Sequence, residues 1–157
     1  MTESTVLAVD EIDAVIVPLA KMRGALLPIL HALQDRFGYV PKEAVPMIAK
    51  ALNLSRAEVH GVITYYHHFR DHPPGRHIVR LCRAEACQAT GADALAEHAK
   101  DLLGCDFHAT SADGAVTLEA AYCLGQCAVG PSMLIDDEAI YGRVTPARFE
   151  KVIRELK

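Results

Sequence analysis

This 157-residue chain has no run of lysine or arginine, and its N-terminal apolar stretch is interrupted by Asp13 and Pro18. With 16 basic and 20 acidic residues the formal net charge is -4, which argues against a nucleic-acid surface or a basic membrane-binding helix. The segment 1–22 also carries acids where a secretory signal has basic residues. We therefore expect no nucleic-acid partner, no direct membrane contact and no export.

Proline and glycine are also scarce, with 8 and 10 residues, so a disordered chain is not expected. The length suits one ordinary domain, or a helical segment joined to a compact domain of about 80 residues. Motifs of independent catalysis are missing: the sequence has no Ser/His/Asp arrangement, no P-loop and no G-x-G-x-x-G after a strand. We expect a folded cytoplasmic protein that has no substrate pocket of its own.

The region 1–73 has the apolar spacing of helices. They are predicted at 12–19, 26–37, 41–52 and 55–66. Ser55 and Glu58 form a capping box, in which each side chain satisfies a free backbone N–H at a helix start. The segment His72-Pro-Pro-Gly75 cannot continue a helix, so we place a domain boundary there.

The region 76–157 alternates between strand and helix patterns. Strands are predicted at 78–82 and 115–122, helices at 91–103 and 146–156, and a closing hairpin at 132–141, with the acidic turn 136–138 in solvent. The fold class expected from both regions is α+β, with an N-terminal helical bundle in 1–73 and a compact α/β domain in 76–157.

Two cysteine pairs begin where predicted strands end, Cys82 with Cys87 and Cys123 with Cys127. Thiolates are soft ligands that favour iron–sulfur clusters, zinc and Cu(I). Structural zinc most often uses C-x2-C, whereas a 2Fe-2S cluster needs two thiolates for each iron and is held by two separate loops with wider spacing. The C-x4-C and C-x3-C spacings favour the cluster, and a zinc site or a dithiol or disulfide pair remains an alternative.

Other notable residues have simpler interpretations. Cys105 is expected to be a small, half-buried apolar residue without a ligand role. Tyr65 and Tyr66 are expected in the core of the helical bundle. Arg80 and Arg83 are either charges that tune a nearby cluster or solvent-facing charges of the sheet.

The cysteine loops resemble a known family. CRAEACQATG at 82–91 and YCLGQCAVGPS at 122–132 are similar to the cluster loops of the thioredoxin-like 2Fe-2S subunit of NADH dehydrogenases and related NAD-dependent oxidoreductases. The segment 26–69 resembles the helical N-terminal part of that family. The resemblance extends from about Gly24 to the C-terminus, and Cys105 has no place in its cysteine pattern.

The resemblance implies a thioredoxin-like domain in which Cys82, Cys87, Cys123 and Cys127 bind one 2Fe-2S cluster. It implies a non-catalytic electron-transfer subunit, with FMN and NAD on a flavin/NAD-binding iron–sulfur partner. Within the family, CRAEACQ and CLGQC look most like the gamma subunit of soluble NAD-dependent formate dehydrogenase, whose partner is a molybdenum-containing catalytic subunit. Alternatives are the equivalent subunit of a respiratory NADH:quinone oxidoreductase or an NAD-reducing hydrogenase, or a zinc-stabilised interaction module.

Overall fold

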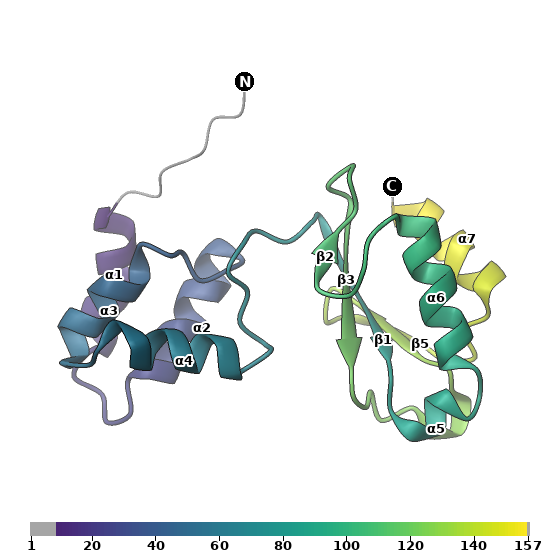
Figure 1. Ribbon diagram of the computed structural model, residues 1–157, viewed down its shortest axis with the longest axis horizontal. Coiled ribbons are helices and arrows are strands. Elements are labelled where there is room, and N and C mark those ends of the chain that lie inside the picture. Colours follow the sequence, from purple (N-terminus) through teal and green to yellow (C-terminus); the bar gives the residue numbers. More distant parts are fainter. Residues whose placement is uncertain (1–8, 157) are drawn as a thin grey trace. The chain divides into compact units, whose positions relative to one another are not determined.

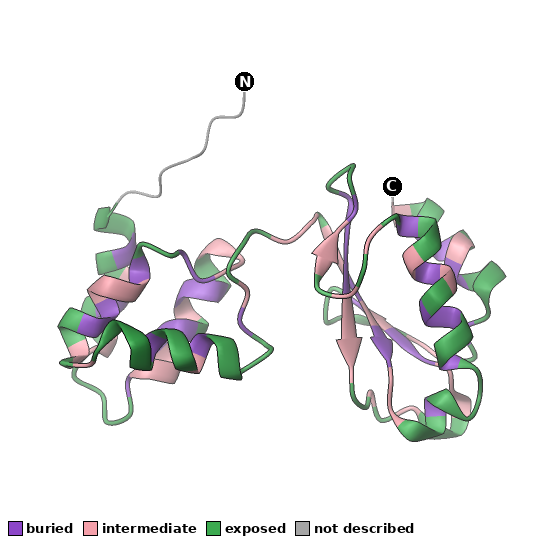
Figure 2. Ribbon diagram, viewed as in Figure 1, coloured by how far each residue is buried: buried purple, intermediate pink, exposed green. Residues whose placement is uncertain are grey.

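The computed structural model describes residues 9–156, which form two compact units divided between Pro73 and Pro74 (Figure 1). Each unit has its own buried core (Figure 2). The described part of the first unit is helical, and the second is built on a five-stranded sheet. The predicted α+β class is confirmed.

The first unit contains the helices α1 (Val9–Leu19), α2 (Leu26–Phe37), α3 (Ala44–Leu52) and α4 (Arg56–Tyr65). Helix α2 has its predicted bounds, and Gly38 ends it in the left-handed conformation, with φ of 82°. Helix α3 begins later than predicted. The N–H of Ala44 bonds to the carbonyl of Pro41 at 3.0 Å, a contact across three residues, so Pro41 opens a turn rather than the helix.

Helix α4 begins at the predicted capping box. The N–H of Glu58 donates to Ser55 Oγ at 3.1 Å, and the N–H of Ser55 donates to Glu58 Oε2 at 2.8 Å. The prediction for the tyrosines at the end of this helix is wrong, since Tyr65 is 75% exposed and Tyr66 is also exposed. The buried side of α4 is narrow and consists of Val59 and Ile63, one turn apart, which leaves no core position for either ring.

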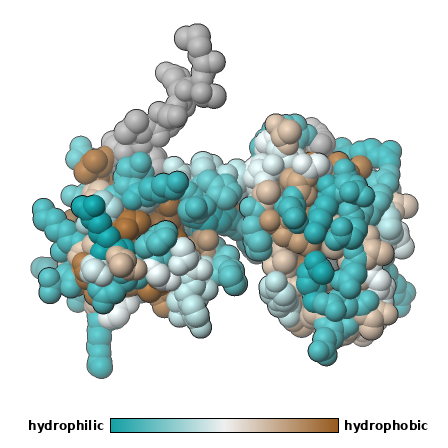
Figure 3. Space-filling view, in the orientation of Figure 1, coloured by the Kyte–Doolittle hydropathy of each residue, from teal (hydrophilic) through white to brown (hydrophobic). Residues whose placement is uncertain are grey.

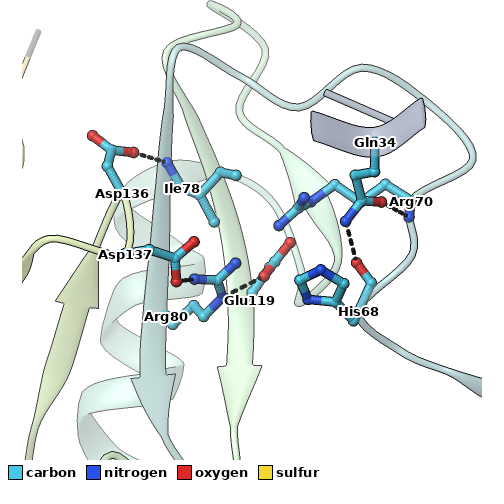
Figure 4. A network of polar contacts seen from close by, with 8 residues as sticks. All are labelled: Gln34, His68, Arg70, Ile78, Arg80, Glu119, Asp136 and Asp137. Atoms are coloured by element: carbon cyan, nitrogen blue, oxygen red, sulfur yellow. Dashed lines mark hydrogen bonds and ion pairs between the residues drawn. The ribbon is translucent and has the colours of Figure 1, made fainter. Parts of the chain in front are cut away.

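A buried glutamine holds the segment that leaves α4. Gln34 Nε2 donates to the carbonyl of His68, and the N–H of Arg70 donates to Gln34 Oε1, both at 2.8 Å (Figure 4). Both ends of the buried amide are therefore satisfied by backbone groups. Phe69, which lies between His68 and Arg70 in the chain, packs in the core of the first unit.

The sheet of the second unit has the order β2-β3-β1-β4-β5. Its strands are β1 (His77–Cys82), β2 (Ala109–Thr110), β3 (Val116–Ala121), β4 (Met133–Ile135) and β5 (Ala139–Tyr141), and its helices are α5 (Glu85–Gln88), α6 (Ala92–Leu103), η1 (Cys127–Val129) and α7 (Pro146–Leu156). Strands β1 and β3 are parallel, and the other pairs are antiparallel. The short elements α5, β2 and η1 were not expected.

Helices α6 and α7 cover the sheet (Figure 1). Their apolar faces pack with the inward side chains of β1, Val79 and Leu81, and Phe149 of α7 is fully buried. Helix α6 lies in the connection between the parallel strands β1 and β3, as in a βαβ unit, and α5 and β2 belong to the same connection. Because parallel strands end at the same edge, the loops that follow β1 and β3 leave the sheet together.

The acidic turn between β4 and β5 does more than face solvent. Asp136 Oδ1 accepts from the N–H of Ile78 at 2.8 Å, and Asp137 pairs with Arg80 (Figure 4). Arg80, whose side chain is 13% exposed, also donates to Glu119 Oε2 at 2.8 Å. The guanidinium is therefore neutralised within the sheet. Residues 136–138 form an exposed turn, so the prediction of a turn in solvent is confirmed, and the contacts of its carboxylates with the sheet are an addition that the sequence did not indicate.

On the face drawn in Figure 3, hydrophilic side chains cover much of both units, and a group of strongly apolar ones is visible among them in the first unit. In the part of the first unit that the structure describes, the exposed large apolar side chains are Val9, Val17, Met22, Tyr65 and Tyr66. Within residues 9–156, no helix is both long enough and apolar enough to cross a bilayer.

Candidate metal centre

The two cysteine pairs follow the two parallel strands. Cys82 is the last residue of β1, and the register places it beside Ala121, the last residue of β3. Cys123 comes two residues later in the chain. The fold thereby brings both cysteine loops to one edge of the sheet, as the positions of the pairs after predicted strands suggested.

The first pair is buried. Cys82 and Cys87 form a small apolar cluster with Ala92, against which Ala84 and Leu124 also pack. Helix α5 is a single turn, and it directs Cys87 inward, leaving 1% of that residue exposed. Leu124 lies between the cysteines of the second pair, so its packing shows that the two loops are in contact.

The second pair is exposed to solvent. Cys123 and Cys127 lie on either side of Gly125, which has a φ of 73°, a conformation that suits glycine. The N–H of Gly125 donates to Cys123 Sγ at 3.3 Å. Hydrogen bonds of this kind stabilise negative charge on sulfur, so the backbone of this loop is arranged for a thiolate.

The thiol of Cys82 has a lowered pKa. Burial by itself raises that pKa, but hydrogen bonds to the sulfur outweigh it and bring the pKa below the usual thiol range. The contributing groups are the backbone N–H groups of Ala84 and Leu124 and the side chains of Cys87 and Ser132. Donors from both cysteine loops therefore favour the thiolate of Cys82, the form that binds metal.

The thiol of Cys127 shows the opposite effect. Its pKa is raised first by the hydrogen bond and charge of Cys123, and the charges of Cys87 and Cys82 add to the shift. The pKa of Cys127 is thus shifted by the other three thiols of the predicted site. Like-charge repulsion among thiolates is relieved when they bind a cation.

The other candidates lie outside this group. Cys105 is half-buried against the core of the second unit, as predicted, and burial, with Asp106 and Asp113 adding, raises the pKa of its thiol. Arg83 directs its guanidinium to Asp93 at 2.9 Å and over the ring of Phe107 at 5.3 Å. Arg83 therefore holds the start of α6 rather than facing solvent freely.

The donor set suits a 2Fe-2S cluster. Two loops each supply two sulfurs, which matches the need of each iron for two thiolates, and backbone N–H groups already point at the sulfurs. Among residues 9–156 no three His, Cys, Asp or Glu side chains are grouped closely enough to hold a single metal ion. A centre of two irons spreads its ligands more widely than a single ion does.

Two residues that follow the second cysteine pair lie next to the first one. A Cβ atom on Gly130 would lie 2.8 Å from Thr90 Oγ1 and 3.3 Å from Cys87 Sγ, so the chain passes close to this cysteine. Ser132 Oγ lies 3.6 Å from the same sulfur. Both belong to the segment 122–132, but only the pairing of β4 with β1 reveals that they face the first cysteine pair.

Comparison with known proteins gives one family. The family model described as "Thioredoxin-like [2Fe-2S] ferredoxin" matches residues 12–157. The "NADP-reducing hydrogenase subunit HndA" of Solidesulfovibrio fructosivorans is 32% identical over 145 residues, which cover 92% of this chain and 84% of the relative. A subunit of the NADH-quinone oxidoreductase of Pseudomonas aeruginosa is 34% identical over 131 residues, 83% of this chain and 78% of the relative.

A solved structure has the same fold. The crystal structure of an NAD+-reducing [NiFe]-hydrogenase in the air-oxidised state superimposes with a TM-score of 0.65 over 81% of this chain, at 22% sequence identity. The matched region is 22% of the hydrogenase chain, so the present chain spans about a fifth of that protein's length.

Proposed function

This chain belongs to the thioredoxin-like [2Fe-2S] ferredoxin family, whose members bind one 2Fe-2S cluster, and we propose that the ligands of that cluster are Cys82, Cys87, Cys123 and Cys127. The observation that carries the proposal is the meeting of both cysteine loops at one edge of the sheet. The function is electron transfer without chemistry on a substrate.

When bound, a 2Fe-2S cluster supplies a one-electron carrier whose potential depends on charge, hydrogen bonds to sulfur and solvent exposure. The residues of this chain divide these tasks. Cys82 and Cys87 anchor the centre in an apolar environment, and the N–H groups of Gly125 and Leu124 donate to sulfur. Cys123 and Cys127 are exposed, which gives a partner protein access to this side of the centre.

The partner that we propose is a flavin/NAD-binding iron–sulfur subunit that carries FMN and NAD. The names of the two relatives support this, because both are subunits of enzymes that use NADP or NADH. The finer proposal is the gamma subunit of a cytoplasmic NAD-dependent formate dehydrogenase, with a molybdenum-containing catalytic subunit in the assembly. Its support is the resemblance of CRAEACQ and CLGQC to that group.

The second candidate is the equivalent subunit of an NAD(P)-reducing hydrogenase or a respiratory NADH:quinone oxidoreductase. The names and identities of the two relatives favour it. Electron transfer by this chain is the same in each assembly, and the difference lies in the companion subunits. A zinc-stabilised interaction module is the alternative from another class.

The test is to purify the native assembly through this chain under anaerobic conditions. In this chain, once it is separated from its companion subunits, we expect two irons and two acid-labile sulfides, as a 2Fe-2S centre requires, and a paramagnetic signal after dithionite reduction. Molybdenum and formate-dependent NAD reduction in the same preparation would support the formate dehydrogenase; nickel or quinone reductase activity would support the second candidate. A colourless, zinc-containing protein would contradict both.

A further inference from the structure

The hydroxyl of Ser132 is enclosed by the first cysteine pair. Ser132 directly precedes β4 and is 1% exposed. Its Oγ lies 3.6 Å from Cys87 Sγ, and it also hydrogen-bonds the thiol of Cys82. In the part of the chain that the structure describes, these sulfurs are the partners we find for this hydroxyl. A buried hydroxyl without a partner is costly, so the contact with sulfur is what satisfies this group.

The sheet fixes the position of this hydroxyl. Strands β1 and β4 are antiparallel, with Leu81 opposite Met133, which places Ser132 opposite Cys82. The N–H of Cys82 donates to the carbonyl of Ser132 at 3.0 Å. Residues directly opposite in an antiparallel pair carry their side chains on the same face. The contact between the hydroxyl and the sulfurs therefore follows from strand register and does not depend on a mobile loop.

The direction of the hydrogen bond changes with the state of the cysteines. Between a hydroxyl and a thiol either group can donate, but a thiolate that is a metal ligand has no proton. Ser132 is then the donor. A donor to a ligand sulfur stabilises the more negative, reduced form of an iron–sulfur centre, which raises its reduction potential.

We infer that Ser132 sets the reduction potential of the proposed centre by donating its hydroxyl hydrogen bond to the sulfur of Cys87. This inference rests on the proposed function. The change is one electron gained by the centre from an external reductant such as dithionite, with no bond broken and the proton remaining on Ser132. Ser132 is a positioning residue, since it acts through the ligands.

The test compares Ser132→Ala with the parent protein by potentiometric titration followed by electron paramagnetic resonance. We expect unchanged iron and sulfide content and a lower potential. At a fixed potential the ratio of reduced to oxidised centre falls about three- to tenfold, the effect of losing one such hydrogen bond. A tenfold fall corresponds to about 59 mV for one electron.

Thr90→Val is the matched control. The hydroxyl of Thr90 lies in the same loop but donates to the carbonyls of Ala86 and Cys87, at 3.1 and 3.0 Å, rather than to sulfur. We expect its potential to stay close to that of the parent. A change in Ser132→Ala that is no larger than the change in Thr90→Val would overturn the inference.

A second pair of variants separates the loss of the hydroxyl from a change in side-chain packing. Ser132→Thr and Ser132→Val have nearly the same shape, and only the threonine keeps the hydroxyl. The threonine variant is expected to have the higher potential, and equal potentials would overturn the inference. Absence of iron and sulfide from the parent protein would instead overturn the proposed function, so the two failures are distinguishable.

Discussion

At the scale of single residues, the surroundings of Cys87 are closely packed. Gly130 has φ of -63° and ψ of 160°, angles that any residue can adopt, so its backbone does not require glycine. The surrounding contacts require glycine at this position, because a Cβ atom would lie 2.8 Å from Thr90 Oγ1. Hydrogen bonds to two carbonyl groups hold that hydroxyl in place. The loop is therefore intolerant of one added carbon.

The substitution Gly130→Ala should perturb the centre more than the fold. Overpacking costs about 1–3 kcal/mol, and the strain falls on Thr90 and Cys87. We expect faster loss of iron in air with little change in far-ultraviolet circular dichroism. Gly61→Ala is the control, because a Cβ atom there meets nothing within 4 Å. Equal rates of iron loss in Gly130→Ala and the parent would contradict the expected strain.

Replacement of Cys87 and replacement of Cys105 by alanine are expected to have sharply different effects. Cys87→Ala removes a proposed ligand, and we expect loss of visible absorption, iron and sulfide. Cys105→Ala should keep all three, because Cys105 packs against the core of the second unit rather than with the two pairs. Iron and sulfide analysis of the two variants distinguishes a cluster ligand from a cysteine without a ligand role. A colourless Cys105→Ala protein that remains folded would argue against the proposed ligand set.

At the scale of elements, short pieces position the site and the ends of the helices. The single turn α5 turns Cys87 inward, and the loop before η1 supplies the N–H that faces Cys123. Helix α4 likewise depends on its first residues, where Ser55 and Glu58 satisfy each other's backbone groups. Its narrow buried side gives it less support from packing than α2 has.

The capping box predicts a pH dependence. Hydrogen bonds from the backbone and side chain of Ser55 lower the pKa of Glu58. Its contribution to α4 is complete above the ordinary glutamate pKa of about 4.3 and is lost as the pH falls through the lowered pKa of the folded protein. An NMR titration of the Glu58 carboxyl carbon should show a midpoint below about 4.3, and Ser55→Ala should raise it. A midpoint unchanged by Ser55→Ala would contradict this account.

At the scale of the whole molecule, both units expose large apolar side chains. The second unit, which carries the proposed centre, exposes Leu102, Tyr122 and Ile140, and the first exposes two tyrosines whose rings meet edge to face at 5.1 Å. The first unit also has an open groove of about 450 Å³ whose lining, which includes Leu26 and Leu54, is uncharged. Exposed aromatic and apolar residues are typical of protein interfaces.

We predict that the first unit contributes to binding of the flavin subunit. The double variant Tyr65→Ser with Tyr66→Ser should lower the affinity for that subunit about tenfold or more, as loss of buried aromatic contacts does. Its iron content should stay that of the parent, because the tyrosines are exposed. Leu102→Ser, which removes an exposed apolar residue from the second unit, serves as the control. Equal affinity of the double variant and the parent, measured by co-purification, would contradict the prediction.

The sequence predicted the larger elements because their signals are local. Apolar spacing located α2, α6 and α7, and the capping box marked the start of α4. The position of each cysteine pair after a strand indicated one shared site. The tyrosines of α4 were misplaced because apolar character along one helix does not say how wide its buried side is.

The sequence by itself therefore determined the type of chemistry, four thiols in two loops, and the α+β class. Only the tertiary structure decided which side of the site is buried, which carboxylates neutralise Arg80, and that Ser132 faces Cys87. The physical reason is that strand register joins residues far apart in the chain. A shift of one residue would turn each side chain to the other face, and no local pattern records that choice.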